Sequence, residues 1–149
     1  LTPVAVYEDD VDQPYVLGTE LSFAADATGN RYTVSGFEIN TGWRTLLCGH
    51  EAVIQIPIDD LPAEGTVTVH VGVYSADSVA RNAIIYANDY EKYKGTVDKS
   101  QNKTGIEFEV PVDVIRQQDD VLTIRFVLPD IAEGDETTRS FSLKTLWIK

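Results

Sequence analysis

The feature that most constrains the fold is a two-residue alternation of apolar and polar side chains that recurs along the chain. Its clearest instance is the segment 66–73, in which every second residue is a valine: Val67, Val69, Val71 and Val73. Successive side chains of a β-strand point to opposite faces, so such a segment buries one face and leaves the other toward solvent. The pattern therefore predicts a strand of an antiparallel sheet with one face on the core.

The same two-residue period appears in most other segments. The breaks between these segments contain turn residues and not helix-capping residues. Further strands are expected around 21–23, 32–37, 52–58, 83–88, 90–97, 106–110, 122–128 and 141–148, with Asn88-Asp89 as a tight hairpin turn. Two short stretches, 59–64 and 112–118, are compatible with helix and are expected to be connecting turns. The chain is predicted to be all-β: an antiparallel, jelly-roll-like β-sandwich of about eight to ten strands.

Length and composition support one folded unit. A chain of 149 residues with 43% hydrophobic residues is long and apolar enough to bury a core. We expect one β-sandwich domain over residues 1–149, with 1–14 as a loose lead-in or edge strand. The chain starts at Leu1 without a signal pattern, so it is expected to be a piece of a longer protein.

Charge and cysteine content exclude several classes of partner. The 24 acidic residues outnumber the 12 basic ones, giving a formal charge of −12, which disfavours nucleic acid and anionic membrane surfaces. The apolar runs are much shorter than the ~20 residues that cross a bilayer, so no membrane span is expected in this segment. Cys48 is the single cysteine, so neither a disulfide framework nor a cysteine zinc cluster is expected.

Catalytic patterns are weak, and no catalytic residue is predicted. The sequence has no G-x-S-x-G nucleophile motif, and its two imidazoles are His50 and His70. His70 falls in the polar register of its strand and is predicted to be a solvated sheet residue, whereas His50, at a loop-to-strand junction, is interpreted as structural. Adjacent acidic pairs such as Asp59-Asp60 alternate between faces, which disfavours a shared site for glycoside hydrolysis.

The acidic loops offer one alternative, a calcium site. Hard oxygen ligands from a loop suit Ca²⁺, although no EF-hand spacing occurs and a solvated charge run is the favoured interpretation. No cofactor is therefore predicted, and calcium is the alternative. Its ligands would be Asp130, Glu133, Asp135 and Glu136, or the early set Glu8, Asp9, Asp10 and Asp12.

Aromatic residues are the candidates for ligand contact, because sugars stack on exposed aromatic rings. The alternative is that the same rings fill the core. The scarce arginines Arg125 and Arg139 are expected to pair with acids such as Asp130 or Asp135 and to fix a loop. The aromatic contact candidates are Trp43, Tyr90, Tyr93 and Trp147.

Several segments together resemble a known domain. They are Leu17–Phe23, Gly36-Phe37, Gly49–Ala52, and above all the run Val121–Asp130 that leads to the closing segment 139–148. From Gly18 to Ile148 the chain resembles the C-terminal β-sandwich of bacterial multi-pass membrane glycosyltransferases and phosphoglycerol transferases. The resemblance implies a non-catalytic accessory domain outside the cytoplasm, at the cell surface, whose partner is cell-envelope polysaccharide or the parent transferase.

A second hypothesis uses the same sandwich differently. The chain would be a carbohydrate-binding module of a secreted polysaccharide-degrading enzyme, since fold alone does not choose between these functions. Membrane spans upstream of Leu1 would favour the transferase, and an upstream hydrolase domain would favour the binding module.

Overall fold

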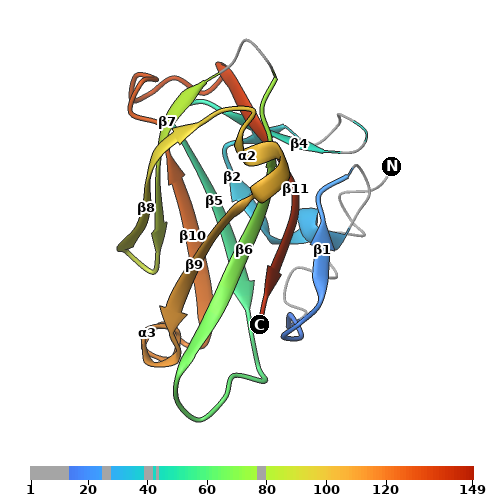
Figure 1. Ribbon diagram of the computed structural model, residues 1–149. Helices are drawn as coiled ribbons and strands as arrows, with labels where there is room; N and C mark the ends of the chain where they lie inside the picture. The colour runs from blue at the N-terminus through green and yellow to red at the C-terminus, as the bar shows by residue number, and fades with distance from the viewer. Residues whose placement is uncertain (1–13, 25–27, 39–41, 43, 77–79) are drawn as a thin grey trace, which may run out of the picture.

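Two antiparallel sheets lie face to face and enclose the apolar residues of the alternating segments (Figure 1). The computed structural model describes residues 14–24, 28–38, 42, 44–76 and 80–149. The strands are β1 (Glu20–Ser22), β2 (Thr33–Ser35), β3 (Phe37–Glu38), β4 (Thr45–Cys48), β5 (Glu51–Pro57), β6 (Thr66–Tyr74), β7 (Arg81–Ala87), β8 (Tyr90–Val97), β9 (Ile106–Pro111), β10 (Val121–Val127) and β11 (Arg139–Ile148).

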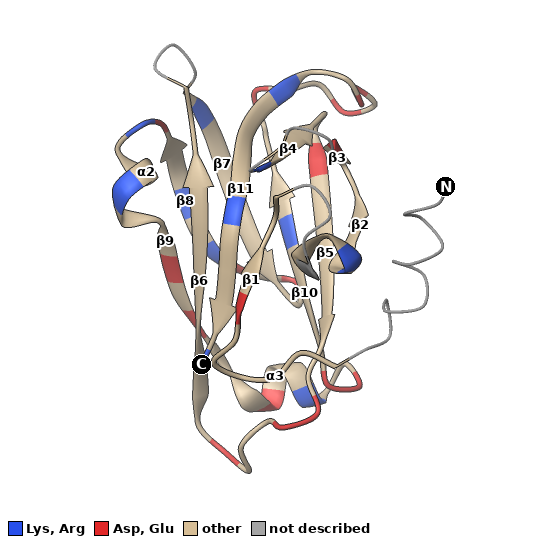
Figure 2. Ribbon diagram, turned by 90° about the vertical axis from the view of Figure 1, so that its right-hand side faces the viewer, with Lys and Arg blue, Asp and Glu red and all other residues tan. Residues whose placement is uncertain are grey.

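The strand order confirms the predicted all-β sandwich of jelly-roll type. Six strands form one sheet in the order β3-β4-β11-β6-β9, with β1 also paired to β11, and the other five follow the order β2-β5-β10-β7-β8. Consecutive strands often lie in different sheets, as β4 and β5 do, so the chain repeatedly crosses between the layers (Figure 2). The described strands exceed the predicted eight to ten because β4 is not among the predicted segments and the predicted strand 32–37 is divided into β2 and β3.

The alternation decides which side chains form the core. In β6 the four valines are at most 1% exposed, and the inward residues of β10, Leu122, Ile124 and Phe126, are fully buried. The intervening residues of the two strands are partly buried or exposed, apart from the buried Gly72, so each strand contributes one face to the core. Apolar burial on this scale is the main term that favours folding.

The last strand departs from strict alternation. Leu143 and Leu146 are three residues apart, yet both are fully buried. The pairing of β11 with β6 shifts register between Leu143 and Thr145, so Lys144 is an extra residue of a β-bulge. Because of the extra residue, the side chains that face the core change from odd-numbered ones before the bulge to even-numbered ones after it. Trp147 therefore lies on the outer face.

The β7–β8 hairpin has the predicted turn, and that turn is tied to a third strand. Asn88 and Asp89 have φ values of +45° and +73°, the left-handed pair of a type I′ turn. The side-chain amide of the buried Asn88 donates to the carbonyl oxygens of Val114 and Val121 at 3.2 and 3.0 Å, and its Oδ1 accepts from the Thr123 amide at 2.6 Å. Asn88 therefore connects the turn to the start of β10.

Helices among the described residues are short. They are the 3-10 helix η1 (Thr28–Tyr32), α2 (Gln101–Thr104) and α3 (Val112–Arg116). The stretch 112–118 thus contains one helical turn, while 59–64 has none. The strand expected over 32–37 is wrong in detail, because Tyr32 belongs to η1 and Gly36, at φ +81°, separates β2 from β3. None of the described helices is long and apolar enough to cross a bilayer.

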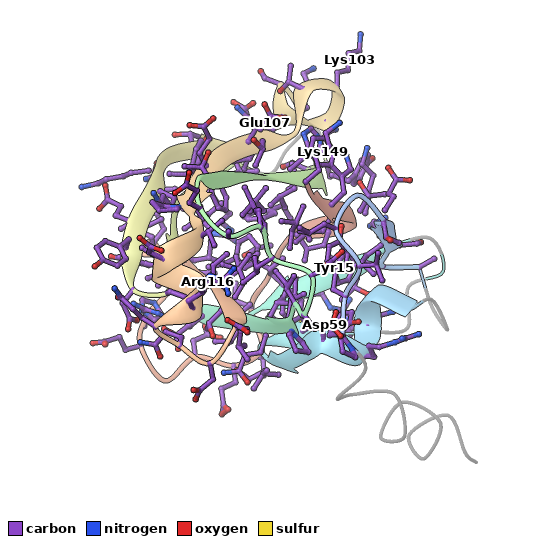
Figure 3. All side chains as sticks on the ribbon, turned by 90° about the horizontal axis from the view of Figure 1, so that it is seen from below. Tyr15, Asp59, Lys103, Glu107, Arg116 and Lys149 are labelled. Carbon is purple, nitrogen blue, oxygen red and sulfur yellow. The ribbon has the colours of Figure 1, made fainter. Side chains whose placement is uncertain are left out.

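Tyr15 holds the start of the described chain against both sheets (Figure 3). Its amide donates to the Pro57 carbonyl at the end of β5, at 2.7 Å, and its hydroxyl accepts from the Ile148 amide of β11, at 2.9 Å. The hydroxyl also contacts the Thr19 carbonyl oxygen, and the side chain is 2% exposed. Of the predicted lead-in 1–14, residues 1–13 lie outside the described residues.

Candidate functional site

A hollow of about 630 Å³ opens on the outer face of the five-stranded sheet, at the end where β4 leads into β5. The outward residues of β5, β7 and β10 form its floor, and the loop between β10 and β11 forms one wall. That loop is acidic (Figure 2). The hollow is lined by Ser35, Gly36, Phe37, Cys48, His50, Glu51, Tyr86, Arg125, Val127, Glu133, Gly134, Asp135 and Glu136.

The wall is held in place by a close backbone approach at Gly49. Gly49 has φ +91°, and a Cβ there would lie 2.4 Å from the carbonyl oxygen of Asp135. The Gly49 amide donates to the Thr138 carbonyl at 2.8 Å, and the His50 amide donates to the Asp135 carbonyl at 3.0 Å. Glycine is therefore required for the β4–β5 turn to pack against the β10–β11 loop.

Arg125 is the central polar side chain of the floor. The strand register places it opposite Val53 of β5 and Tyr86 of β7, so all three share the outer face. Its guanidinium lies 4.4 Å from the centre of the Tyr86 ring, and its Nη1 lies 2.9 Å from Oε2 of Glu51. The cation–π contact and the ion pair together hold the guanidinium in one orientation.

This arrangement suits a ligand rich in hydroxyl groups. The Arg125 side chain is 33% exposed and that of Glu51 is 42% exposed, so both reach solvent while paired. A guanidinium offers several fixed donors and a carboxylate offers acceptors, so neighbouring hydroxyls can donate to one group and accept from the other. A few converging polar groups on a partly apolar floor are typical of small-molecule sites.

His50 and Cys48 line the hollow but are engaged by the protein. The Nδ1 of His50 lies 2.6 Å from the Ile131 carbonyl oxygen, which can only accept, so Nδ1 carries the proton and donates. This contact ties the β10–β11 loop to the start of β5, consistent with the structural role predicted for His50. Burial, and then the nearby Glu38 carboxylate, raise the pKa of the Cys48 thiol, which favours the unreactive protonated form.

The four carboxylates of the calcium alternative do not converge. No group of three or more acidic, histidine or cysteine side chains within the described ranges could hold a metal ion. Asp135 instead accepts from the amides of Thr137 and Thr138 and, at 2.6 Å, from the Thr138 hydroxyl. These hydrogen bonds, that from the Thr138 hydroxyl first, lower the pKa of Asp135. Asp130 accepts from the Asn82 amide. The early set at 8–12 lies outside the described residues.

Tyr90 and Tyr93 lie on β8, at the edge of the five-stranded sheet. Tyr93 is paired with the buried Ile85, so it faces inward, packs against the core, and burial raises the pKa of its hydroxyl. Tyr90, at the hairpin turn, is 56% exposed. Neither lines the hollow.

Trp147 lies on the outer face of the opposite sheet. The register aligns it in one row across four strands with Glu20, His70 and Glu107. Its ring stacks on the His70 ring, 4.7 Å between centres, and the Lys149 ammonium lies 4.4 Å from the ring centre. Figure 3 shows Lys149 and Glu107 on this outer side. These contacts leave less ring surface for a sugar, and His70 is a partly exposed sheet residue, as its register predicts.

The predicted aromatic contacts are therefore not brought together, since Trp147 and the two tyrosines lie on different sheets. Trp43 lies outside the described residues. The expected arginine pairings are wrong: Arg125 pairs with Glu51, and Arg139 makes two contacts to Glu38, at 2.8 and 3.1 Å. The acids of the loop are nearer in sequence, but cross-strand register decides which charges meet.

Comparison with known proteins supports the fold. No protein-family model matches the sequence, and no curated protein matches it. Among solved structures, a family 35 carbohydrate-binding module from Paenibacillus barcinonensis is similar with a TM-score of 0.50 and 17% identity, over 89% of this chain and 98% of that one. The chain shares the fold of that carbohydrate-binding module.

Two further structures are similar at lower scores. A family 35 carbohydrate-binding module from Clostridium thermocellum has a TM-score of 0.47 at 12% identity, over 88% of this chain and 98% of that one. An exo-β-1,3-galactanase from Phanerochaete chrysosporium has a TM-score of 0.45 at 15% identity, over 89% of this chain. This chain spans 29% of the length of that galactanase. None of these three similarities adds support for a transferase parent.

Sequence reasoning singled out the acids Glu133, Asp135 and Glu136 of the hollow's wall, as calcium ligands, and missed the arrangement of its floor. Arg125 stands out in the sequence because arginines are scarce, but nothing in the spacing joins it to Tyr86 and Glu51. One signal was available in the sequence. The alternation places Arg125, Tyr86 and Glu51 at outward-facing positions of their strands, where a charged group and an aromatic ring can be exposed together.

Proposed function

We propose that this chain is a carbohydrate-binding module, part of a secreted polysaccharide-degrading enzyme, that binds glycan at the Arg125 hollow without reacting with it. The observation that carries the proposal is the guanidinium of Arg125, held between Tyr86 and Glu51 at the floor of an open hollow. The shared fold is one that carbohydrate-binding modules use, but the same fold can serve other functions, so the proposal rests on the site. The module would act outside the cytoplasm, where a secreted polysaccharide-degrading enzyme meets its substrate.

The test is a glycan array followed by calorimetric titration of the array-positive polysaccharide. Arg125→Ala removes the guanidinium and should weaken binding by at least about tenfold, as expected for hydrogen bonds to a charged group. Arg139→Ala is the matched control, since Arg139 also pairs with a glutamate but does not line the hollow. Absence of binding across the array, or equal effects of the two substitutions, would refute the proposal.

The accessory role on a membrane glycosyltransferase or phosphoglycerol transferase stays a prediction. Its support is the sequence resemblance over Gly18–Ile148, and its partner would be envelope polysaccharide or the parent enzyme. The sequence upstream of Leu1 distinguishes the two functions, since membrane spans would select the transferase and a hydrolase domain would select the binding module.

A further inference from the structure

A second, smaller hollow lies on the same outer face of the five-stranded sheet. Its volume is about 180 Å³. Gln55 and Pro57 of β5 and Val121 of β10 contribute to it, together with the segment that runs from η1 into β2. Gln55 is exposed, and Val34 at the rim is 57% exposed. Arg31 also lines this hollow, so a guanidinium and a planar amide lie beside apolar side chains there.

The strand register aligns the two hollows. On β5 the outward residues are Glu51 in the first hollow, Val53, and then Gln55 in the second. On β10, the next side chain on the outer face from Arg125 toward the second hollow is Thr123, which is paired with Gln55. Gln55 lies four positions beyond Glu51 on the strand, or about 13 Å at ~3.3 Å per residue. The line between the hollows therefore follows β5 and β10.

The face between the hollows is suited to side-chain recognition of an extended ligand. Both β5 and β10 are interior strands of the five-stranded sheet, so neither is an edge strand to which a peptide strand could add. Val53 and Thr123, which lie between the two hollows, are half-buried. A chain crossing this surface is recognised by its hydroxyl groups and apolar faces.

The charges of the two hollows together disfavour an anionic chain, since the described lining of the second hollow adds one cation, Arg31. Arg125 is already neutralised by Glu51, while Glu133 and Glu136 on the first hollow's wall are exposed. The described lining of that hollow thus carries more carboxylates than cations, in a protein of formal charge −12. A polyanionic glycan would be repelled at short and long range.

Resting on the proposed function, we infer that the two hollows are subsites of one groove along β5 and β10, which binds an extended, uncharged polysaccharide over several sugar units. Arg125 holds one unit, Gln55 holds a later unit of the same chain, and the surface of Val53 and Thr123 lies beneath the linkage between them.

The test titrates the protein with xylo-, manno- and β-1,3-galacto-oligosaccharides of two and six units. With the sugar type that binds, the hexamer should bind at least about tenfold more tightly than the dimer, and polygalacturonate should not bind. Gln55→Ala should weaken hexamer binding about fivefold and leave dimer binding unchanged, as expected for loss of one neutral hydrogen bond. Glu109→Ala, an exposed strand residue of the opposite sheet, is the control and should change neither.

The outcomes separate the two ideas. If dimer and hexamer bind equally and Gln55→Ala has no effect, the groove is refuted while glycan binding at Arg125 stands. If none of the six oligosaccharides binds, the groove for these uncharged chains is refuted, and the glycan array then decides the proposed function independently. Amide chemical-shift changes on hexamer addition should extend from Arg125 to Gln55, and changes confined to the first hollow would also refute the groove.

Discussion

Substitution of Asn88 tests whether the β7–β8 turn is fixed by its side chain or by its backbone. Its amide makes three hydrogen bonds to the segment that enters β10, and the residue is 7% exposed at φ +45°. Three hydrogen bonds at about 1 kcal/mol each, plus about 1 kcal/mol for a left-handed non-glycine residue, give about 4 kcal/mol for Asn88→Ala. Asn88→Gly avoids the backbone term and should destabilise by about 3 kcal/mol.

The assay is urea denaturation followed by tryptophan fluorescence. A loss of about 4 kcal/mol is a large part of the 5–15 kcal/mol typical of folded domains, so the midpoint should fall clearly while the slope stays constant. Asp89→Gly is the control at the same turn; it relieves φ +73° and should stabilise by about 0.5–1 kcal/mol. If Asn88→Ala changes the free energy of unfolding by less than about 1 kcal/mol, the proposed connection to β10 is wrong.

Three further predictions concern other contacts. Tyr15→Phe removes the acceptor for the Ile148 amide and should lower the free energy of unfolding by about 1–2 kcal/mol in urea titration. Gly49→Ala should lower the melting temperature by several degrees more than Gly134→Ala, since both have φ near +90° but only Gly49 abuts a backbone oxygen. The fold lowers the pKa of Asp135, so the ionised carboxylate stabilises the protein above pH ~4, and this stabilisation is lost as the pH falls further. Asp135→Asn should therefore weaken the acid dependence of the free energy of unfolding. An unchanged dependence on pH would contradict this prediction.

The strands and the core follow from local sequence because alternation is a local property. The valines of β6 and the inward residues of β10 could be assigned to a buried face from parity alone, and the Asn88-Asp89 turn from its composition. Where the local signal is short or broken, prediction failed. Prediction missed β4, joined β2 and β3 into one strand and did not anticipate the bulge at Lys144, because these features depend on pairing with other strands.

The sequence by itself determined that this protein is an all-β sandwich and which side chains face its interior, because burying one face of each alternating strand removes apolar surface from water. The tertiary structure alone decided that Arg125 meets Tyr86 and Glu51 and that Trp147 lies on the other sheet. Register between strands is set by long-range pairing, and a difference of one residue exchanges the two faces of a strand. The site is therefore a product of which strands become neighbours, and that information is not local to any segment.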